Sequence, residues 1–214
     1  MKYRKLVENA KKPNGFWGKM MIKAMNKGHS SLTSWGLEHM NIERTATVLD
    51  IGCGGGKPVD RLCSIVANGK VYGIDYSELS VKSSEKLNSK NILCNKAKIL
   101  QASVSDMPFD DNTFDNITAV ETYYFWPDKE NDVKEVFRVL KQGGTVMLLF
   151  EMLRTDDDPF KWEKVENMLN IKSVTPQEIR AVLESAGFEN INTYTKEGTT
   201  WLCATAQKPK DDEN

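Results

Sequence analysis

The chain has 214 residues, of which 40% are hydrophobic and 28% charged, and its formal net charge at pH 7 is −1. These values predict one globular domain with a sizeable core and no broad electrostatic footprint for nucleic acid, although a local basic patch stays open. The four cysteines form no C-x-x-C pair and no segment is apolar enough to span a bilayer, so we expect no metal site, no disulfide framework, no membrane partner and a cytoplasmic location.

The first part of the chain is predicted to form a helical lid over residues 1–42. Aromatic residues and methionines recur at helical spacing from Phe16 to Met25, which predicts an amphipathic helix that ends near Gly28. A second, short helix is predicted over residues 33–40, with Ser31 or Thr33 as its N-cap.

From residue 47 onward, strands alternate with helices. Apolar and β-branched runs predict strands over residues 47–51, 70–75, 99–103, 114–121 and 145–151. Helices are predicted over residues 58–66, 77–88, 128–140, 160–169 and 176–186, and a closing pair of strands over residues 190–196 and 200–206. This order predicts an α/β fold with a largely parallel sheet. The domain is expected to span residues 43–208, followed by a disordered tail over residues 209–214.

A glycine-rich stretch, G-C-G-G-G at residues 52–56, separates the first of these strands from its helix. Such a turn places backbone N–H groups at a helix N-terminus, where a ligand can approach the main chain closely. The dinucleotide pattern G-x-G-x-x-G fails because its last glycine would fall on Lys57, and the phosphate loop fails because Pro58 follows Lys57. A tight turn that binds nothing is the alternative.

Two acidic residues accompany this turn. Asp50 lies within the first strand, and Asp75 ends the next strand, V-Y-G-I-D at residues 71–75. A carboxylate at this second position is where a nucleoside-binding sheet accepts hydrogen bonds from ribose hydroxyls. An exposed loop aspartate is the alternative for Asp75.

Several motifs together resemble those of the class I S-adenosylmethionine (SAM) dependent methyltransferases, in particular the small-molecule type 11 group. The first motif, L-D-I-G-C-G-G-G at residues 49–56, is similar to the usual L-D-x-G-C-G-x-G. The others are V-Y-G-I-D at residues 71–75, S-V-S-D-M-P-F at 103–109 with D-N-T-F-D at 111–115, V-L-K-Q-G-G at 139–144 and A-G-F at 186–188. The match runs from about residue 45 to 208.

This resemblance implies a Rossmann-like three-layer sandwich, with a seven-stranded, mostly parallel sheet whose last strand is antiparallel, and SAM as cofactor. It implies that backbone atoms of the glycine turn line the amino acid end of SAM, that Asp75 binds its ribose, and that Tyr76 lies against adenine. Ser103 stands where the family often has the aspartate that holds the adenine amino group, so adenine contacts are expected from the backbone of Val104 and from nearby side chains. The cofactor-binding residues predicted in this way are Asp50, Gly52, Cys53, Gly54, Asp75, Tyr76, Ser103, Val104 and Glu121.

The acceptor is expected at the carboxyl end of the fourth strand, where the sequence reads V-E-T-Y-Y-F-W-P-D. The tetrapeptide [DN]-P-P-[YF], which is typical of family members that modify nucleic-acid amino groups, is absent here. The aromatic residues instead suggest a walled pocket for a small acceptor. Glu121 is predicted to hold the cofactor ammonium, to hold the acceptor, or to act as the general base. Tyr123 is predicted to lie in the pocket wall. His29 of the lid is a second candidate base. The structural alternatives are that the aromatic rings pack in the core, that Glu121 is a surface carboxylate and that His29 is a capping residue.

The sequence therefore predicts an enzyme that transfers a methyl group from SAM to a small molecule, mainly by orienting the two reactants. An RNA or protein methyltransferase and a non-catalytic SAM-binding protein remain open. A nucleotide-dependent oxidoreductase is disfavoured by Lys57. Nucleic acid is not an expected partner, and the sequence does not indicate an oligomeric state.

Overall fold

The central feature of the fold is one twisted sheet of seven strands. The computed structural model describes residues 13–210, except for the side chains of residues 23, 24, 26 and 27. The strands lie in the order β3-β2-β1-β4-β5-β7-β6, and every pair is parallel except those that β7 makes with β5 and β6. Their bounds are Thr47–Ile51 (β1), Lys70–Asp75 (β2), Ala97–Gln101 (β3), Phe114–Val120 (β4), Leu140–Phe150 (β5), Glu189–Thr195 (β6) and Leu202–Gln207 (β7). This confirms the predicted fold class.

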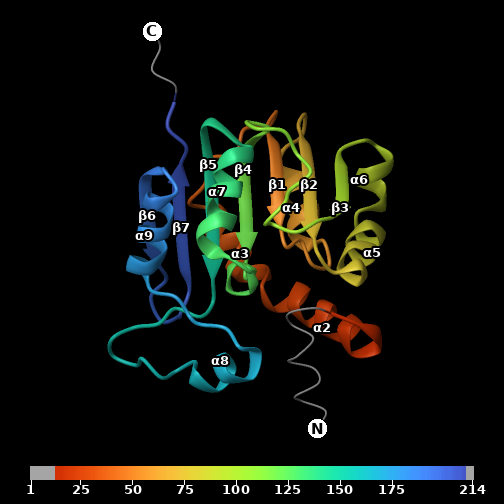
Figure 1. Cartoon of the computed structure of the whole chain (residues 1–214). Helices are drawn as coiled ribbons and strands as arrows, with labels where there is room; N and C mark the ends of the chain where they lie inside the picture. The colour runs from red at the N-terminus through yellow and green to blue at the C-terminus, as the bar shows by residue number, and fades with distance from the viewer. Residues whose placement is uncertain (1–12, 211–214) are drawn as a thin grey trace.

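Helices pack on both faces of the sheet, which gives three layers (Figure 1). One face is covered by α7 (Lys129–Val139) and α9 (Pro176–Ser185), the other by α3 (Ser30–Leu37), α4 (Lys57–Ile65) and α5 (Glu78–Leu87). Side chains alternate between these layers along a strand: Leu49 packs toward α7 and α9, whereas Val48 packs toward α4. Both are fully buried, as expected for a parallel sheet covered on both faces.

The remaining helices lie nearer the ends of the sheet. In Figure 1, α2 (Gly15–Gly28) and α8 (Glu163–Leu169) lie beyond the carboxyl ends of the parallel strands. A short α6 (Ser89–Leu93) precedes β3, and a single turn of 3₁₀ helix, η1 (Tyr123–Phe125), follows β4. Ligands of open α/β sheets bind outside the carboxyl ends of the strands, so α2 and α8 flank the place where a site is expected. Among the described residues, no helix has the length and hydropathy needed to cross a membrane.

Several predicted boundaries differ from the structure, and three of them concern the second helix, β3 and β5. The second helix begins at Ser30, because the Thr33 hydroxyl donates to the carbonyl of His29 within the helix instead of capping it. β3 ends at Gln101, so Ser103 follows the strand. β5 begins at Leu140, directly after α7, and runs through the predicted turn, because glycine tolerates the close backbone contacts there: a Cβ at Gly144 would lie 2.8 Å from the Lys141 carbonyl.

Candidate functional site

The glycine turn after β1 is bound to the end of β2 by backbone hydrogen bonds. The amides of Gly52 and Cys53 both donate to the carbonyl of Ile74, at 2.8 and 2.9 Å. Gly52 has a φ of +70°, and a Cβ there would lie 2.2 Å from Oγ1 of Thr122. Only glycine fits both this backbone conformation and this contact, so the first glycine serves to pack the turn against the end of β4.

Gly54 occupies a different environment in the same turn. Its φ is +52°, and a Cβ there would meet nothing closer than the Gly52 carbonyl at 3.9 Å. The amide of Gly54 donates to Oδ2 of Asp75 at 3.0 Å, and Oδ1 of Asp75 accepts from the amide of Ser77 at 2.8 Å. Burial raises the pKa of Asp75, although these two hydrogen bonds oppose that effect. The second glycine therefore leaves open space beside a carboxylate that the backbone holds in place.

Asp50 lies behind the turn and not in the open space. It is 1% exposed, its Oδ1 accepts from the Thr118 hydroxyl at 2.8 Å, and its Oδ2 is buried without a hydrogen-bond partner among the described residues. Burial raises its pKa to about 7. The thiol of Cys53 is also buried, and burial raises its pKa well above the usual range, so only the backbone of Cys53 is suited to contact a polar ligand.

Two adjoining cavities cross the carboxyl edge of the sheet. The first lies between the glycine turn and α2, and its lining includes His29, Gly54, Arg61 and Glu121. The second has a volume of about 670 Å³ and reaches toward the segment after α8. The residues that line both cavities are Gly52, Asp75, Tyr76, Thr122 and Phe125. Asp75 therefore lies where the two cavities meet.

The second cavity combines apolar walls with a few polar groups. Ile74, Val104 and Phe125 contribute apolar surface, and Tyr76 lies at the border with the first cavity. Ser103 also lines this cavity, where its hydroxyl accepts a hydrogen bond from the amide of Ser105 at 3.2 Å. Apolar walls with a few polar groups suit a small heterocycle.

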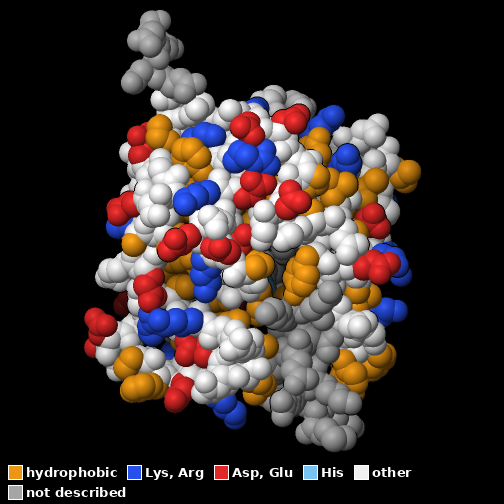
Figure 2. All heavy atoms as spheres, viewed as in Figure 1, with side chains coloured by type: hydrophobic (Ala, Val, Ile, Leu, Met, Phe, Trp, Pro, Cys, Tyr) orange, Lys and Arg blue, Asp and Glu red, His pale blue; other side chains and the backbone are white. Residues whose placement is uncertain are grey.

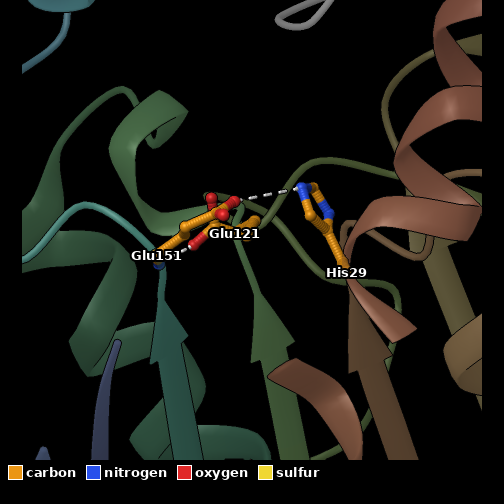
Figure 3. Close-up of side chains that lie close together, drawn as sticks. All are labelled: His29, Glu121 and Glu151. Carbon is orange, nitrogen blue, oxygen red and sulfur yellow. Dashed lines mark hydrogen bonds and ion pairs between the residues drawn. The ribbon is translucent and has the colours of Figure 1, made fainter. Parts of the chain in front are cut away.

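A histidine and two carboxylates lie close together at the first cavity, which is lined by His29 and Glu121 (Figure 3). Nε2 of His29 lies 3.8 Å from Oε2 of Glu151, and the imidazole and the carboxylates of Glu121 and Glu151 each place one ligand atom within 4.8 Å of the others. Burial raises the pKa of Glu121 to about 8, although the hydrogen bond from the Glu151 amide opposes this. Burial also lowers the pKa of His29, and the nearby Glu151 charge acts in the opposite direction.

Of the two tyrosines after Glu121, the structure brings only one to the site. Tyr123 is 4% exposed, packs against Trp126 and Phe150, and lines neither cavity. Tyr124 lines the second cavity, and its hydroxyl donates to Oε1 of Glu121 at 3.4 Å and accepts from the amide of Met152 at 3.0 Å. Tyr124 and not Tyr123 therefore lines the second cavity, because the 3₁₀ turn directs the Tyr123 ring into the core.

The other predicted site residues lie along the two cavities, with Asp50 behind them. The sequence analysis missed Arg61, which lines the first cavity and donates to the carbonyl of Ser30 at 2.9 Å, and residues 170–172 after α8, which line the second. It also left Thr122 and Tyr124 out. Their position directly after a strand end was a usable signal, whereas the places of Arg61 and of residues 170–172 depend on tertiary packing.

Comparisons with known proteins identify the family of the chain. The sequence profile of the family described as "Methyltransferase domain" matches residues 49–148. The "Uncharacterized methyltransferase YdaC" of Bacillus subtilis is 27% identical over 183 residues, which cover 85% of this chain and 93% of that protein. The "Ubiquinone/menaquinone biosynthesis C-methyltransferase UbiE" of Cronobacter sakazakii is 31% identical over 73% of this chain and 72% of its own length.

A solved structure of the complex between the Haloferax volcanii Trm112 methyltransferase activator and a methyltransferase is also similar. Its matching chain superposes with a TM-score of 0.74 at 20% identity, covering 88% of this chain and 93% of that one. This likeness concerns the fold alone.

Proposed function

Because the chain belongs to the class I SAM-dependent methyltransferases, we propose that it transfers a methyl group from SAM to a small-molecule acceptor bound at the end of the first cavity that carries His29 and Glu121. The observation that carries this proposal is the position of Asp75, which lines both cavities at the place where they adjoin. A ribose bound there directs the two ends of the cofactor into opposite cavities.

The residues present fit this cofactor. The open space at Gly54 leaves room for the amino acid end beside backbone amides, and the apolar walls at Tyr76 and Val104 suit adenine. Ser103 replaces the aspartate that the resemblance associates with the adenine amino group. Its hydroxyl already accepts from the Ser105 amide, so the proposed adenine contact comes from the Val104 backbone.

The chemistry requires orientation more than acid–base groups. When SAM is bound, its sulfonium supplies an activated methyl group for in-line displacement. The protein aligns the acceptor with that group and excludes water. Alignment of this kind in general lowers the activation barrier by on the order of 7–11 kcal/mol. Thr122 and Phe125 line both cavities and therefore lie near the proposed ribose position, and α2 lies beside the first cavity.

Three observations support a small acceptor. The proposed acceptor end is a cavity between α2 and the sheet, a shape suited to a small molecule. The face in Figure 2 carries acidic and basic side chains intermixed, without the continuous basic stripe that a nucleic-acid substrate favours among its described residues. The name of UbiE assigns a small-molecule pathway to that relative.

A turnover screen tests the proposal. Purified chain and SAM are incubated with separate pools of thiols, amines, phenols and carbon acids, and release of S-adenosylhomocysteine (SAH) is measured. The proposal predicts acceptor-dependent release with at least one pool and its loss in the Gly54→Ala variant. SAH release that no small-molecule pool stimulates, but that purified RNA or protein does, contradicts the small acceptor.

A further inference from the structure

His29, Glu121 and Glu151 form a cluster that the methyl transfer itself does not require. Each residue directly follows a regular element: His29 follows α2, Glu121 follows β4, and Glu151 follows β5. Figure 3 shows the imidazole facing the two carboxylates across a short gap. We propose that these three side chains bind one divalent metal ion of the transition series, such as Zn²⁺, Mn²⁺ or Fe²⁺.

The spacing of the ligand atoms suits an ion. The 3.8 Å between Nε2 of His29 and Oε2 of Glu151 exceeds the range of a hydrogen bond. Ligand atoms that share one ion at about 2.0–2.2 Å lie roughly 3.0–3.5 Å apart. Because one atom from each of the three residues already lies within 4.8 Å of the others, shifts of less than about 1 Å complete the coordination.

Glu121 is held in the orientation that a ligand needs. Its φ of +57° is unusual for a residue with a side chain, and its amide donates to the carbonyl of Leu149 at 2.9 Å. Its Oε1 accepts from the amide of Glu151 and from the Tyr124 hydroxyl. Supporting hydrogen bonds of this kind fix the carboxylates of metal sites.

The charge of the cluster favours a cation. Among the described side chains, no lysine or arginine forms an ion pair with Glu121 or Glu151, and the one charged contact is the pair between His29 and Glu151. Two neighbouring carboxylates in a partly enclosed position disfavour the ionisation of both, and a cation between them would favour the doubly ionised form. One imidazole with two carboxylates is a mixed nitrogen and oxygen set, which suits the ions named above better than Ca²⁺ or Mg²⁺.

The cluster leaves one side of the ion accessible. His29 and Glu121 line the first cavity, so three protein ligands on one side leave coordination positions that face the proposed acceptor. An ion here would orient an acceptor through an oxygen or nitrogen atom. It would also connect the end of α2 to the ends of β4 and β5.

The experiment measures metal binding without SAM, so its outcome is independent of the proposed methyl transfer. Full-length protein without a histidine tag is stripped with a chelator, desalted, and titrated with Zn²⁺ and with Mn²⁺ in separate calorimetric runs. We expect one ion per chain and at least a 10-fold weaker affinity in His29→Gln, Glu121→Gln and Glu151→Gln. The control Glu163→Gln removes an exposed carboxylate from α8 and should bind as the unmodified chain does.

Glu151→Gln is the decisive variant, because its side chain is 47% exposed and its backbone amide still donates to Glu121. Equal affinity of Glu151→Gln and the unmodified chain overturns the proposal, as does failure of both ions to bind at one per chain. A parallel titration with ethylammonium tests an organic cation. Glu151-dependent binding of ethylammonium without metal binding also overturns the metal site.

Discussion

The amide of Gly54 donates a hydrogen bond of 3.0 Å to Oδ2 of Asp75, and this bond joins the glycine turn after β1 to the end of β2. The other oxygen of Asp75 accepts from the amide of Ser77, the N-cap of α5. One carboxylate thus fixes two backbone segments at the place where the two cavities meet. The proposed ribose site depends on this arrangement.

Asp75→Asn tests the ribose role. Asparagine keeps a similar shape but loses the charge that strengthens hydrogen bonds to hydroxyl groups, each of which contributes about 1.5–3 kcal/mol when the acceptor is charged. Its NH₂ group also cannot accept from one of the two backbone amides that Asp75 binds. We therefore expect SAH to bind at least 10-fold more weakly, as measured by calorimetry. Asp110→Asn, which changes an exposed aspartate, is the control. Unchanged SAH affinity in Asp75→Asn would refute the role.

Gly54→Ala tests whether the open space at the turn holds the cofactor. The added methyl group meets no protein atom closer than 3.9 Å, so we expect a folded protein with a modest loss of stability and at least a 10-fold loss of SAH affinity. Gly198→Ala is a matched control, since Gly198 also has a positive φ and open space but lies outside both cavities. Equal SAH affinities of the two variants would contradict the proposed position of the cofactor.

The raised pKa of the buried Asp50 carboxylate predicts that the stability of the fold depends on pH. Its pKa is about 7 in the folded chain against an ordinary value of 3.8, so between these values the folded state binds more protons than the unfolded state. The contribution of Asp50 is fully present below about pH 4 and is lost as the pH rises through about 7. Asp50→Asn should remove this loss, roughly 2–4 kcal/mol in the free energy of unfolding.

Urea denaturation of the protein without cofactor at pH 5 and pH 8 measures this effect. The control Asp110→Asn should keep the pH dependence of the unmodified chain. If Asp50→Asn and the unmodified chain lose the same free energy of unfolding between pH 5 and pH 8, the pKa of Asp50 in the folded chain is not raised into this range.

The two neighbouring tyrosines should differ in their contribution to stability. Tyr124→Phe removes the acceptor for the buried amide of Met152, which costs about 1–3 kcal/mol, whereas no hydrogen bond from a described residue reaches the Tyr123 hydroxyl. We expect Tyr123→Phe to change the free energy of unfolding, measured in urea, by much less than Tyr124→Phe. The reverse order would show that Tyr123 occupies the role assigned to Tyr124.

These residues show which features the sequence could predict. The strand, turn and helix around Gly52 and the carboxylate of Asp75 could be predicted, because each depends on local patterns that recur in parallel α/β sheets. Which of Tyr123 and Tyr124 lines the cavity could not be predicted. Successive side chains of a 3₁₀ turn point in different directions, and tertiary packing decides which one enters the core.

The cluster of His29, Glu121 and Glu151 could not be predicted as a unit either. Its members come from three separate segments, and their convergence depends on how α2 lies against the ends of β4 and β5. His29 and Glu121 were predicted as candidates because each is a titratable residue in a segment expected near the site. The sequence alone gave no metal ligand set, because ligand spacing along the chain is informative only when the ligands are close in sequence.

The destination of the methyl group tests the central claim most directly. A cell extract is incubated with the purified chain and SAM that carries a trideuterated methyl group, and small molecules, RNA and protein are then separated and analysed by mass spectrometry. We predict that a small molecule gains the deuterated methyl group, and that Gly54→Ala abolishes the gain. Label that appears only in RNA or protein, or a small-molecule gain that Gly54→Ala leaves unchanged, would contradict the proposed function.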